Sequence, residues 1–137
     1  ESYKLDDAEY AMVIIGSAAG TAKDTVDALR EQGVKAGVLK IRLFRPFPAE
    51  EIAKALEGKK AIACMDRTES YNANCGPIGS EVKSALYTAG STSIRLARNF
   101  SCMAHPTARV AAMVVSDMND RLSPKNDPPT ISAAIIG

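Results

Sequence analysis

Residues 38–48 have the sequence Val-Leu-Lys-Ile-Arg-Leu-Phe-Arg-Pro-Phe-Pro, in which branched and aromatic side chains are followed by prolines. The apolar bulk is typical of a buried strand and comes from Val38, Leu39, Ile41, Leu43 and Phe44. The strand must end at Pro46 and Pro48, because neither residue has an N–H to donate to a sheet. Pro48 suits the first position of a helix, and Glu50 and Glu51 lie in its first turn, where the helix dipole favours acidic side chains. The stretch therefore predicts a strand, a rigid loop and a helix in direct succession.

Apolar periodicity on both sides of this stretch predicts further strands that alternate with helices. We expect strands over residues 10–15, 34–44, 61–65 and 93–100, helices over 20–32, 49–56 and 78–89, and a short edge strand within 2–5. Such alternation implies right-handed crossovers between parallel strands, with helices on both faces. The predicted fold class is therefore α/β, a three-layer α/β/α arrangement with a mainly parallel sheet of about five strands.

Length and charge limit the possible classes of protein. A chain of 137 residues fits one domain with a buried core. Lys and Arg number 17 against 16 Asp and Glu, so the formal charge of +1 gives no field that attracts nucleic acid or anionic lipid. The longest apolar runs are far shorter than the roughly 20 residues that a membrane span needs. We therefore expect neither nucleic acid nor a membrane as a partner.

The cysteines indicate a reducing compartment. Cys64, Cys75 and Cys102 are three in number and cannot all pair with one another, and the first residues lack the apolar core of a secretory signal. We therefore expect free thiols and a cytoplasmic location. The three cysteines and His105 are too dispersed for a metal or iron–sulfur site. Cys64 is predicted to lie in a strand core, and Cys75 to be a loop cysteine rather than an activated thiolate.

Residues 16–21, Gly-Ser-Ala-Ala-Gly-Thr, follow a predicted strand and open a helix. Backbone N–H groups and the helix dipole can hold a phosphate at such a place. The stretch lacks both the G-x-G-x-x-G spacing and the lysine of a nucleotide-binding loop. A tight strand-to-helix turn is therefore favoured over the alternative, an anion-binding turn formed by Gly16, Ser17, Gly20 and Thr21.

Asp66 and Arg67 directly follow the third long strand, at the sheet edge where α/β proteins place ligands. A loop ion pair or an interface contact is favoured over an acid–base role, since no histidine is near in sequence. No set of nucleophile, base and orienting group is visible, so we assign no catalytic, cofactor-binding or metal residue. A rigid turn that presents arginine and aromatic side chains suits an interface. The predicted interface residues are Arg42, Phe44, Arg45, Pro46, Phe47, Asp66 and Arg67, of which Arg45 and Phe47 are expected to face a partner domain.

Over residues 3–100 the chain resembles the C-terminal domain of the transketolase superfamily, most closely that of the alpha subunit of pyruvate and other 2-oxoacid:ferredoxin oxidoreductases. The motifs that carry the resemblance are Asp7-Ala-Glu-Tyr10, residues 16–21, residues 39–48, Asp66-Arg67 and Gly76-Pro-Ile-Gly-Ser-Glu-Val82. The resemblance implies a complex that oxidatively decarboxylates a 2-oxoacid with thiamine diphosphate and coenzyme A. Electrons would pass through iron–sulfur clusters to ferredoxin. In the family these cofactors bind to other domains, so the resemblance implies that this chain binds none, is inactive alone and packs against other domains or subunits.

The C-terminal part of the chain departs from the family. After Phe100 the family continues with a glycine-rich segment, whereas this chain has Ser-Cys-Met-Ala-His-Pro. We therefore divide the chain into a domain over residues 1–103 and a divergent C-terminal helix with a Pro-rich tail over 104–137. Two alternatives stay open: a stand-alone domain that binds a small anion or coenzyme A, and the equivalent domain of a transketolase or 2-oxoacid dehydrogenase.

Overall fold

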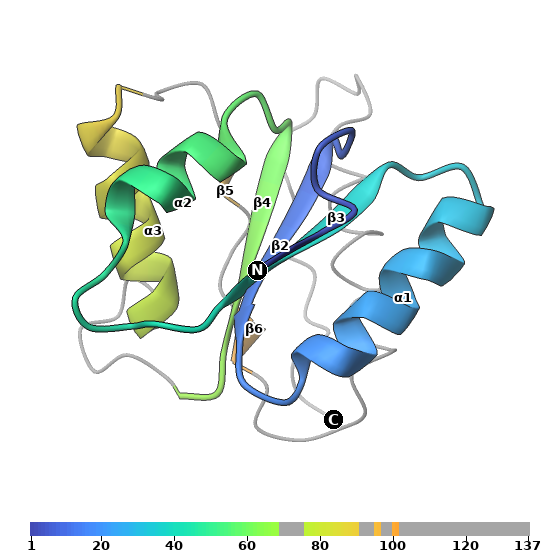
Figure 1. The fold of residues 1–137 in the computed structure, drawn as a ribbon, viewed down its shortest axis with the longest axis horizontal. Helices are drawn as coiled ribbons and strands as arrows, with labels where there is room; N and C mark the ends of the chain where they lie inside the picture. Colours follow the sequence, from blue (N-terminus) through green and yellow to red (C-terminus); the bar gives the residue numbers. More distant parts are fainter. Residues whose placement is uncertain (69–75, 91–94, 97–99, 102–137) are drawn as a thin grey trace, which may run out of the picture.

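The computed structural model describes residues 1–68, 76–90, 95–96 and 100–101 (Figure 1). The elements are β1 (Ser2–Tyr3), β2 (Tyr10–Ile15), α1 (Ala19–Glu31), β3 (Ala36–Ile41), α2 (Ala49–Leu56), β4 (Ala61–Asp66), α3 (Pro77–Thr88), β5 (Arg95–Leu96) and β6 (Phe100–Ser101). The predicted alternation of strands and helices is confirmed. None of the helices in the described ranges is both long and apolar enough to cross a bilayer.

The strands form one mainly parallel sheet in the order β1-β3-β2-β4-β5, and β6 also pairs with β4. β1 is the antiparallel exception and pairs with the outer edge of β3. β2 lies at the centre because the crossover through α1 leads to one side of it and the crossover through α2 to the other. The predicted α/β class is therefore confirmed, and the strand order reverses between β2 and β4.

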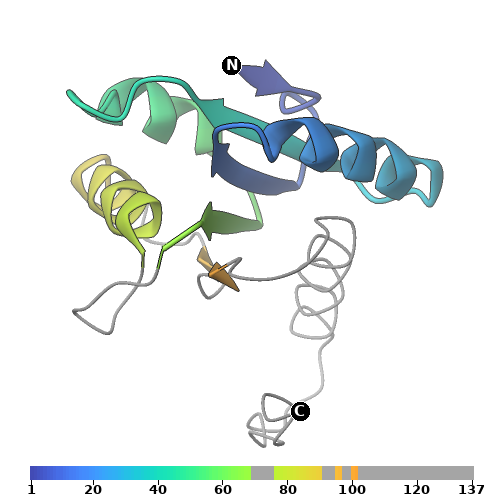
Figure 2. The same ribbon diagram turned by 90° about the horizontal axis from the view of Figure 1, so that it is seen from below.

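Helices cover both faces of the sheet. Figure 2 shows α1 on one side of the strands and α2 with α3 on the other. Side chains alternate along β2 to match, since Val13 packs in the cluster that contains α2 and α3, whereas Met12 and Ile14 pack in the cluster that contains α1. The predicted inward faces are buried, namely Ala22, Val26 and Leu29 of α1 and Val82, Ala85 and Leu86 of α3.

Two strand predictions need correction. The strand predicted over residues 34–44 is shorter in the structure and ends at Ile41. Leu43 is therefore not part of the sheet, and it is 53% exposed. The strand predicted over 93–100 is represented by β5 and β6, which pair with β4 at different points. Residues 97–99 between them lie outside the described ranges, as do the predicted boundary at 103 and the tail 104–137.

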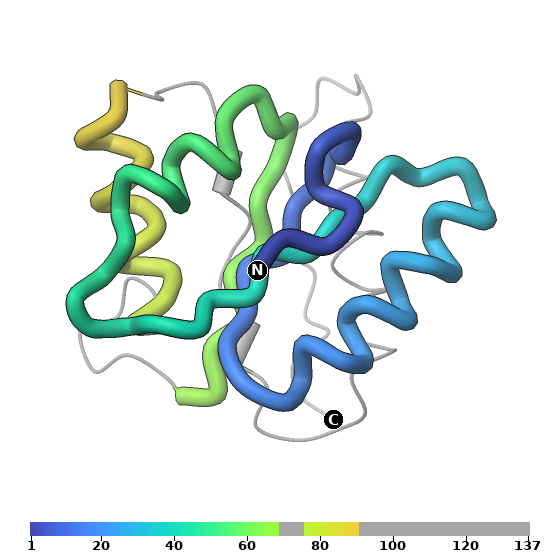
Figure 3. The backbone as a smooth tube through the Cα atoms, viewed as in Figure 1, coloured from blue at the N-terminus to red at the C-terminus, as the bar shows by residue number. Residues whose placement is uncertain are grey.

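Residues 1–9, here called the N-terminal strap, precede the central strand. Figure 3 shows this first segment lying along β3 before the chain turns back into β2. Leu5 and Ala8 of the strap are buried in the α2 and α3 cluster. Lys59, itself 9% exposed, donates from Nζ to the Leu5 carbonyl at 2.6 Å. The strap therefore adds both an edge strand and a part of the core.

Candidate interface at the carboxyl edge of the sheet

The fold brings the predicted motifs together at one edge of the sheet. Ile15 pairs with Ile41, and Ile14 pairs with Met65, so the parallel strands β2, β3 and β4 end side by side. Residues 16–21, 42–48 and 66–67 follow these strand ends directly. This carboxyl edge, at the reversal of strand order, is where α/β proteins place their functional groups.

Residues 16–21 form a tight turn into α1. Gly16 has φ +84°, a left-handed conformation that glycine adopts without strain. The N–H of Gly20 donates to the Ser17 carbonyl at 3.1 Å and that of Ala19 to the Gly16 carbonyl at 3.4 Å. The turn itself thus engages these two N–H groups, which supports the favoured interpretation. Anion binding by Gly16, Ser17, Gly20 and Thr21 stays an untested prediction.

Residues 42–48, here called the proline loop, are attached to the core by two aromatic rings of the loop itself. Phe44 and Phe47 lie edge to face, with ring centroids 6.0 Å apart and an interplanar angle of 83°. Both rings are partly buried against the cluster of α2 and α3. Pro46 follows a cis peptide bond, and the Pro48 carbonyl accepts the Ile52 N–H at 3.0 Å. The loop is therefore fixed to the core at Phe44 and Phe47 and to α2 at its end.

Arg45 is exposed but held in one place. Its side chain is 62% exposed, and its guanidinium carbon lies 4.2 Å from the centroid of the Phe44 ring. One Nη donates to the Phe44 carbonyl at 3.0 Å and the other to the Glu81 carboxylate on α3 at 2.8 Å. An exposed ion pair contributes at most about 1 kcal/mol to stability, so its main effect is on side-chain orientation. Arg45 is therefore accessible, and its contact with a partner domain stays a prediction.

Phe47 and Leu43 differ from expectation in where their side chains lie. The ring of Phe47 packs inward, so its interface role stays a prediction while its packing role is visible. Leu43, which the sequence placed in the strand, is instead one of two large hydrophobic residues exposed in the described ranges, with Tyr87. The exposure of Leu43 could not be predicted from the sequence, because the run of apolar residues continues past the end of β3.

Asp66 caps a helix. The residue is 4% exposed, and its carboxylate accepts the N–H of Ile78 at 3.0 Å and of Gly79 at 3.3 Å, at the start of α3. These N–H groups have no partner within the helix, and the positive end of the dipole favours a carboxylate. None of the ion pairs among the described residues joins Asp66 to exposed Arg67, and the interface role of these two residues stays a prediction.

Gly76 makes this cap possible. A Cβ at Gly76 would come closer than 3.0 Å to three side-chain atoms of Asp66. Gly76 is the N-cap residue of α3, and Pro77 follows it as the first helical residue. The Gly76-Pro77 motif therefore has a local cause, the close approach of a buried carboxylate to the helix start. Glu81 lies one turn further along α3, so this cap also positions the partner of Arg45.

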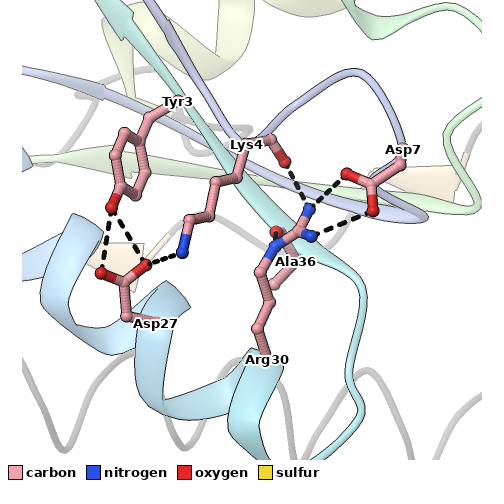
Figure 4. A network of polar contacts seen from close by, with 6 residues as sticks. All are labelled: Tyr3, Lys4, Asp7, Asp27, Arg30 and Ala36. Atoms are coloured by element: carbon pink, nitrogen blue, oxygen red, sulfur yellow. Dashed lines mark hydrogen bonds and ion pairs between the residues drawn. The ribbon is translucent and has the colours of Figure 1, made fainter.

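A network of charged groups ties the strap to α1 (Figure 4). Asp27 accepts the Tyr3 hydroxyl at 2.9 Å and Lys4 Nζ at 2.7 Å. The hydrogen bond from Lys4 has the largest effect on the pKa of Asp27, which it lowers, and the hydrogen bond from Tyr3 lowers this pKa further. Arg30 donates to Asp7 at 2.7 Å and to the backbone carbonyls of Lys4 and Ala36, and it lowers the pKa of Asp7. Every residue in the network bonds another member, so it is a structural clamp.

Two observations on the described residues concern the binding of a metal or cofactor. In these ranges no three His, Cys, Asp or Glu side chains lie close enough to hold a metal ion. Cys64 is buried on β4, while Cys75, Cys102 and His105 lie outside the described residues. A cavity of about 20 Å³ between α1 and the sheet, lined by Met12, Val26 and Leu29 among others, has room for little more than one water. This cavity is too small for thiamine diphosphate, coenzyme A or an iron–sulfur cluster.

Comparison with known proteins agrees with the resemblance in the sequence. Residues 8–104 match the family described as pyruvate:ferredoxin oxidoreductase core domain II. The chain is similar to the NADH-dependent phenylglyoxylate dehydrogenase subunit alpha of Aromatoleum evansii, with 48% identity over 66% of this chain and 22% of the relative. It is also similar to pyruvate synthase subunit PorA of Thermotoga maritima, with 48% identity over 64% of this chain and 22% of the relative.

A third relative is ketoisovalerate oxidoreductase subunit VorA of Pyrococcus abyssi, 43% identical over 69% of this chain and 24% of its own length. The chain thus spans about a quarter or less of these curated relatives. The matched region contains β2 to α3 and all three motifs at the carboxyl edge. The fold, these motifs and the family match lead to one conclusion: this chain belongs to the pyruvate:ferredoxin oxidoreductase core domain II family.

Proposed function

We propose that this chain is a docking domain of a 2-oxoacid:ferredoxin oxidoreductase and performs no chemistry itself. The observation that carries the proposal is the proline loop, which is fixed to the core by Phe44 and Phe47 and exposes Leu43 and Arg45 at the carboxyl edge. A rigid loop loses little conformational entropy on binding, which favours a docking role. The partners would be the other domains and subunits of the complex, with ferredoxin as an indirect partner.

The names of the relatives support a role that is independent of the substrate. They specify phenylglyoxylate, pyruvate and ketoisovalerate as the acid, and one name includes NADH. A similar domain occurs in all of them at 43–48% identity. We propose that the choice of acid and of electron acceptor is made by other parts of the complex, and that this domain supplies packing common to all.

The complex that we propose converts pyruvate or a related 2-oxoacid to acyl-coenzyme A and reduces ferredoxin. Thiamine diphosphate, iron–sulfur clusters and coenzyme A would bind to other domains, as the family resemblance implies. A cytoplasmic location is part of the same proposal. The family match favours this oxidoreductase over the equivalent domain of a transketolase or 2-oxoacid dehydrogenase, which shares the fold.

The test is capture of the remaining subunits and domains of the same organism's oxidoreductase by the immobilised 137-residue chain. We expect capture, and we expect the pure chain to show no 2-oxoacid-dependent reduction of a dye or of ferredoxin. Circular dichroism would first establish that the chain is folded. Turnover by the pure chain would contradict the non-catalytic role, and a folded chain that captures nothing would contradict docking.

The alternative function, binding of a small anion or coenzyme A, rests on the position of residues 16–21 at the reversal of strand order. The first turn of α1 contains no acidic residue that would repel an anion. Calorimetric titration of the folded chain with coenzyme A separates the two functions. Heat of binding at millimolar ligand would favour the alternative, and its absence would remove it.

A further inference from the structure

We infer that Leu43 and Arg45 form a single partner-binding surface whose occupant is an apolar patch bordered by carboxylates on another protein domain of the complex. This inference rests on the proposed docking function and specifies its contact residues and the chemistry of its partner. Leu43 supplies the apolar contact and Arg45 supplies the charged contact. The rings of Phe44 and Phe47 pack against the core and fix the loop that carries both residues.

Leu43 differs from an ordinary exposed apolar residue in how it is presented. Single exposed leucines are common on protein surfaces and need no explanation. Here, however, the next residue, Phe44, is anchored in the core, and Ile41 two residues earlier is 4% exposed in β3. Leu43 is therefore held 53% exposed on a short segment between buried Ile41 and partly buried Phe44. Burial of this remaining apolar area by a partner would favour binding without ordering the loop.

Arg45 has hydrogen-bonding capacity left for a partner. A guanidinium has five N–H donors, and the contacts to the Phe44 carbonyl and to Glu81 use one donor on each Nη. The side chain is 62% exposed, and no hydrogen bond within the described residues uses its other three donors. Stacking on Phe44 fixes the plane of the guanidinium, which suits bidentate binding of a carboxylate.

Charge complementarity selects an acidic partner surface. Arg42 and Arg45 are exposed on either side of Leu43, while Glu81, the acid next to Arg45, is already paired with it. An interface typically has an apolar centre and a polar rim, and Arg is enriched at such positions. A protein patch that is apolar in the centre and carries carboxylates at the rim complements Leu43 and its flanking arginines.

The test compares two loop variants with two matched controls. Leu43→Ser removes the apolar contact, and Arg45→Gln removes the charge. Tyr87→Ser changes the other exposed large hydrophobic residue, on α3, and Lys83→Gln removes an exposed charge from the same helix. The measured quantity is the dissociation constant of each folded variant for the remaining subunits and domains of the oxidoreductase.

We expect each loop variant to weaken binding about ten-fold and each control to change it less than about two-fold. The loss in Arg45→Gln should shrink at 0.5 M NaCl, whereas the loss in Leu43→Ser should persist, because salt screens only the charged contact. Thermal unfolding midpoints near that of the unmodified chain would show that the losses come from the surface.

The outcomes separate this inference from the proposed function. Capture of the partner by the unmodified chain with no loss in Leu43→Ser would overturn the inference and leave the docking function in place. Loss in Leu43→Ser without loss in Arg45→Gln would overturn the acidic rim. No capture by the folded unmodified chain would contradict the docking function itself. Equal losses in Tyr87→Ser would move the interface to α3.

Discussion

The N-terminal strap and the proline loop both adjoin β3, yet different forces hold them in place. The strap buries Leu5 and Ala8 and adds many polar contacts, including those that Asp27 and Arg30 make with it and the ion pairs of Glu1 and Glu9 with lysines. The loop is attached by Phe44 and Phe47, which pack on the core. Exposed ion pairs contribute at most about 1 kcal/mol each, whereas burial of one large apolar side chain contributes about 1.5–3 kcal/mol.

The two attachments should therefore respond to different perturbations. Loss of side-chain volume should affect the loop most, because Phe44 and Phe47 attach it to the core, whereas its Arg45–Glu81 ion pair is exposed. Acid and salt should affect the strap, because its contacts join carboxylates to cations. The strap also depends on space, since its backbone crosses close to Gly37. Each perturbation below therefore acts mainly on one attachment, and the other serves as an internal control.

The largest effect is expected for Phe47→Ala, which removes a ring that supports the proline loop. We expect the free energy of unfolding to fall by about 2–3 kcal/mol, below the range for a fully buried Phe because this ring is only partly buried. Urea unfolding followed by circular dichroism measures the loss. The matched control Leu43→Ser should change the free energy by less than about 0.5 kcal/mol, because Leu43 is exposed. Equal losses in the two variants would show that the loop is not anchored by Phe47.

Gly37→Ala should act on the strap by steric overlap. A Cβ at Gly37 would lie 2.5 Å from the Lys4 carbonyl oxygen and 2.9 Å from the Leu5 Cα, and backbone atoms cannot turn aside as a side chain can. We expect the free energy of unfolding to fall by about 1–3 kcal/mol. Hydrogen exchange should become faster at the Lys40 amide, which donates to the Glu1 carbonyl at 2.8 Å.

Gly20→Ala is the matched control for Gly37→Ala. Gly20 lies in α1, and a Cβ there would meet no atom within 4 Å. Alanine is the better helix former, so this change should stabilise the protein by about 0.4–1 kcal/mol. If Gly37→Ala left both the stability and the Lys40 exchange rate unchanged, the strap would have moved away without cost, and its contribution to the fold would be small.

Local sequence signals were enough for the elements and the layers. The spacing of Ala22, Val26 and Leu29 predicts the buried face of α1, which the structure confirms. Pro48 with Glu50 and Glu51 predicts a helix start at this place, and α2 begins at Ala49 with Pro48 as its N-cap rather than its first residue. These predictions succeed because helix periodicity and helix caps depend on residues within a few positions of one another. The parallel direction of the main strands follows from the helical crossovers that connect them.

Contacts between distant residues could not be predicted in the same way. Asp66 and Ile78 are twelve residues apart, and Tyr3 and Asp27 are twenty-four apart. Nothing close to Asp66 in sequence indicates that its partner is a helix end rather than Arg67, because the choice depends on how α3 packs beside β4. The position of Leu43 could not be predicted for the same reason. The end of a strand is set by its pairing with the neighbouring strand and not by the run of apolar residues alone. The family resemblance was predictable because it rests on motifs rather than on contacts.

The smallest effect is expected from acid, and it should act on the strap. Hydrogen bonds from Lys4 and Tyr3 lower the pKa of Asp27, and the Arg30 hydrogen bond lowers the pKa of Asp7. A carboxylate with a lower pKa in the folded state binds its proton less readily there than in the unfolded chain. Its stabilising contribution is therefore complete above the unfolded pKa and is lost as the pH falls through the folded pKa. We expect the urea midpoint to be constant from pH 7 to about 5 and to decrease below about pH 4.

Asp27→Asn and Asp24→Asn distinguish the strap from acid effects elsewhere in the chain. Asp24 lies on the same helix, is exposed and takes no part in the strap network, so its variant should keep the acid slope of the unmodified protein. Asp27→Asn should reduce the slope, because the amide cannot titrate, and 0.5 M NaCl should reduce it further by screening the pair between Asp7 and Arg30. An unchanged slope in Asp27→Asn would place the acid sensitivity outside the strap. Phe47→Ala should shift every midpoint by a similar amount and leave the slope as it was, since the packing that it removes contains no titrating group.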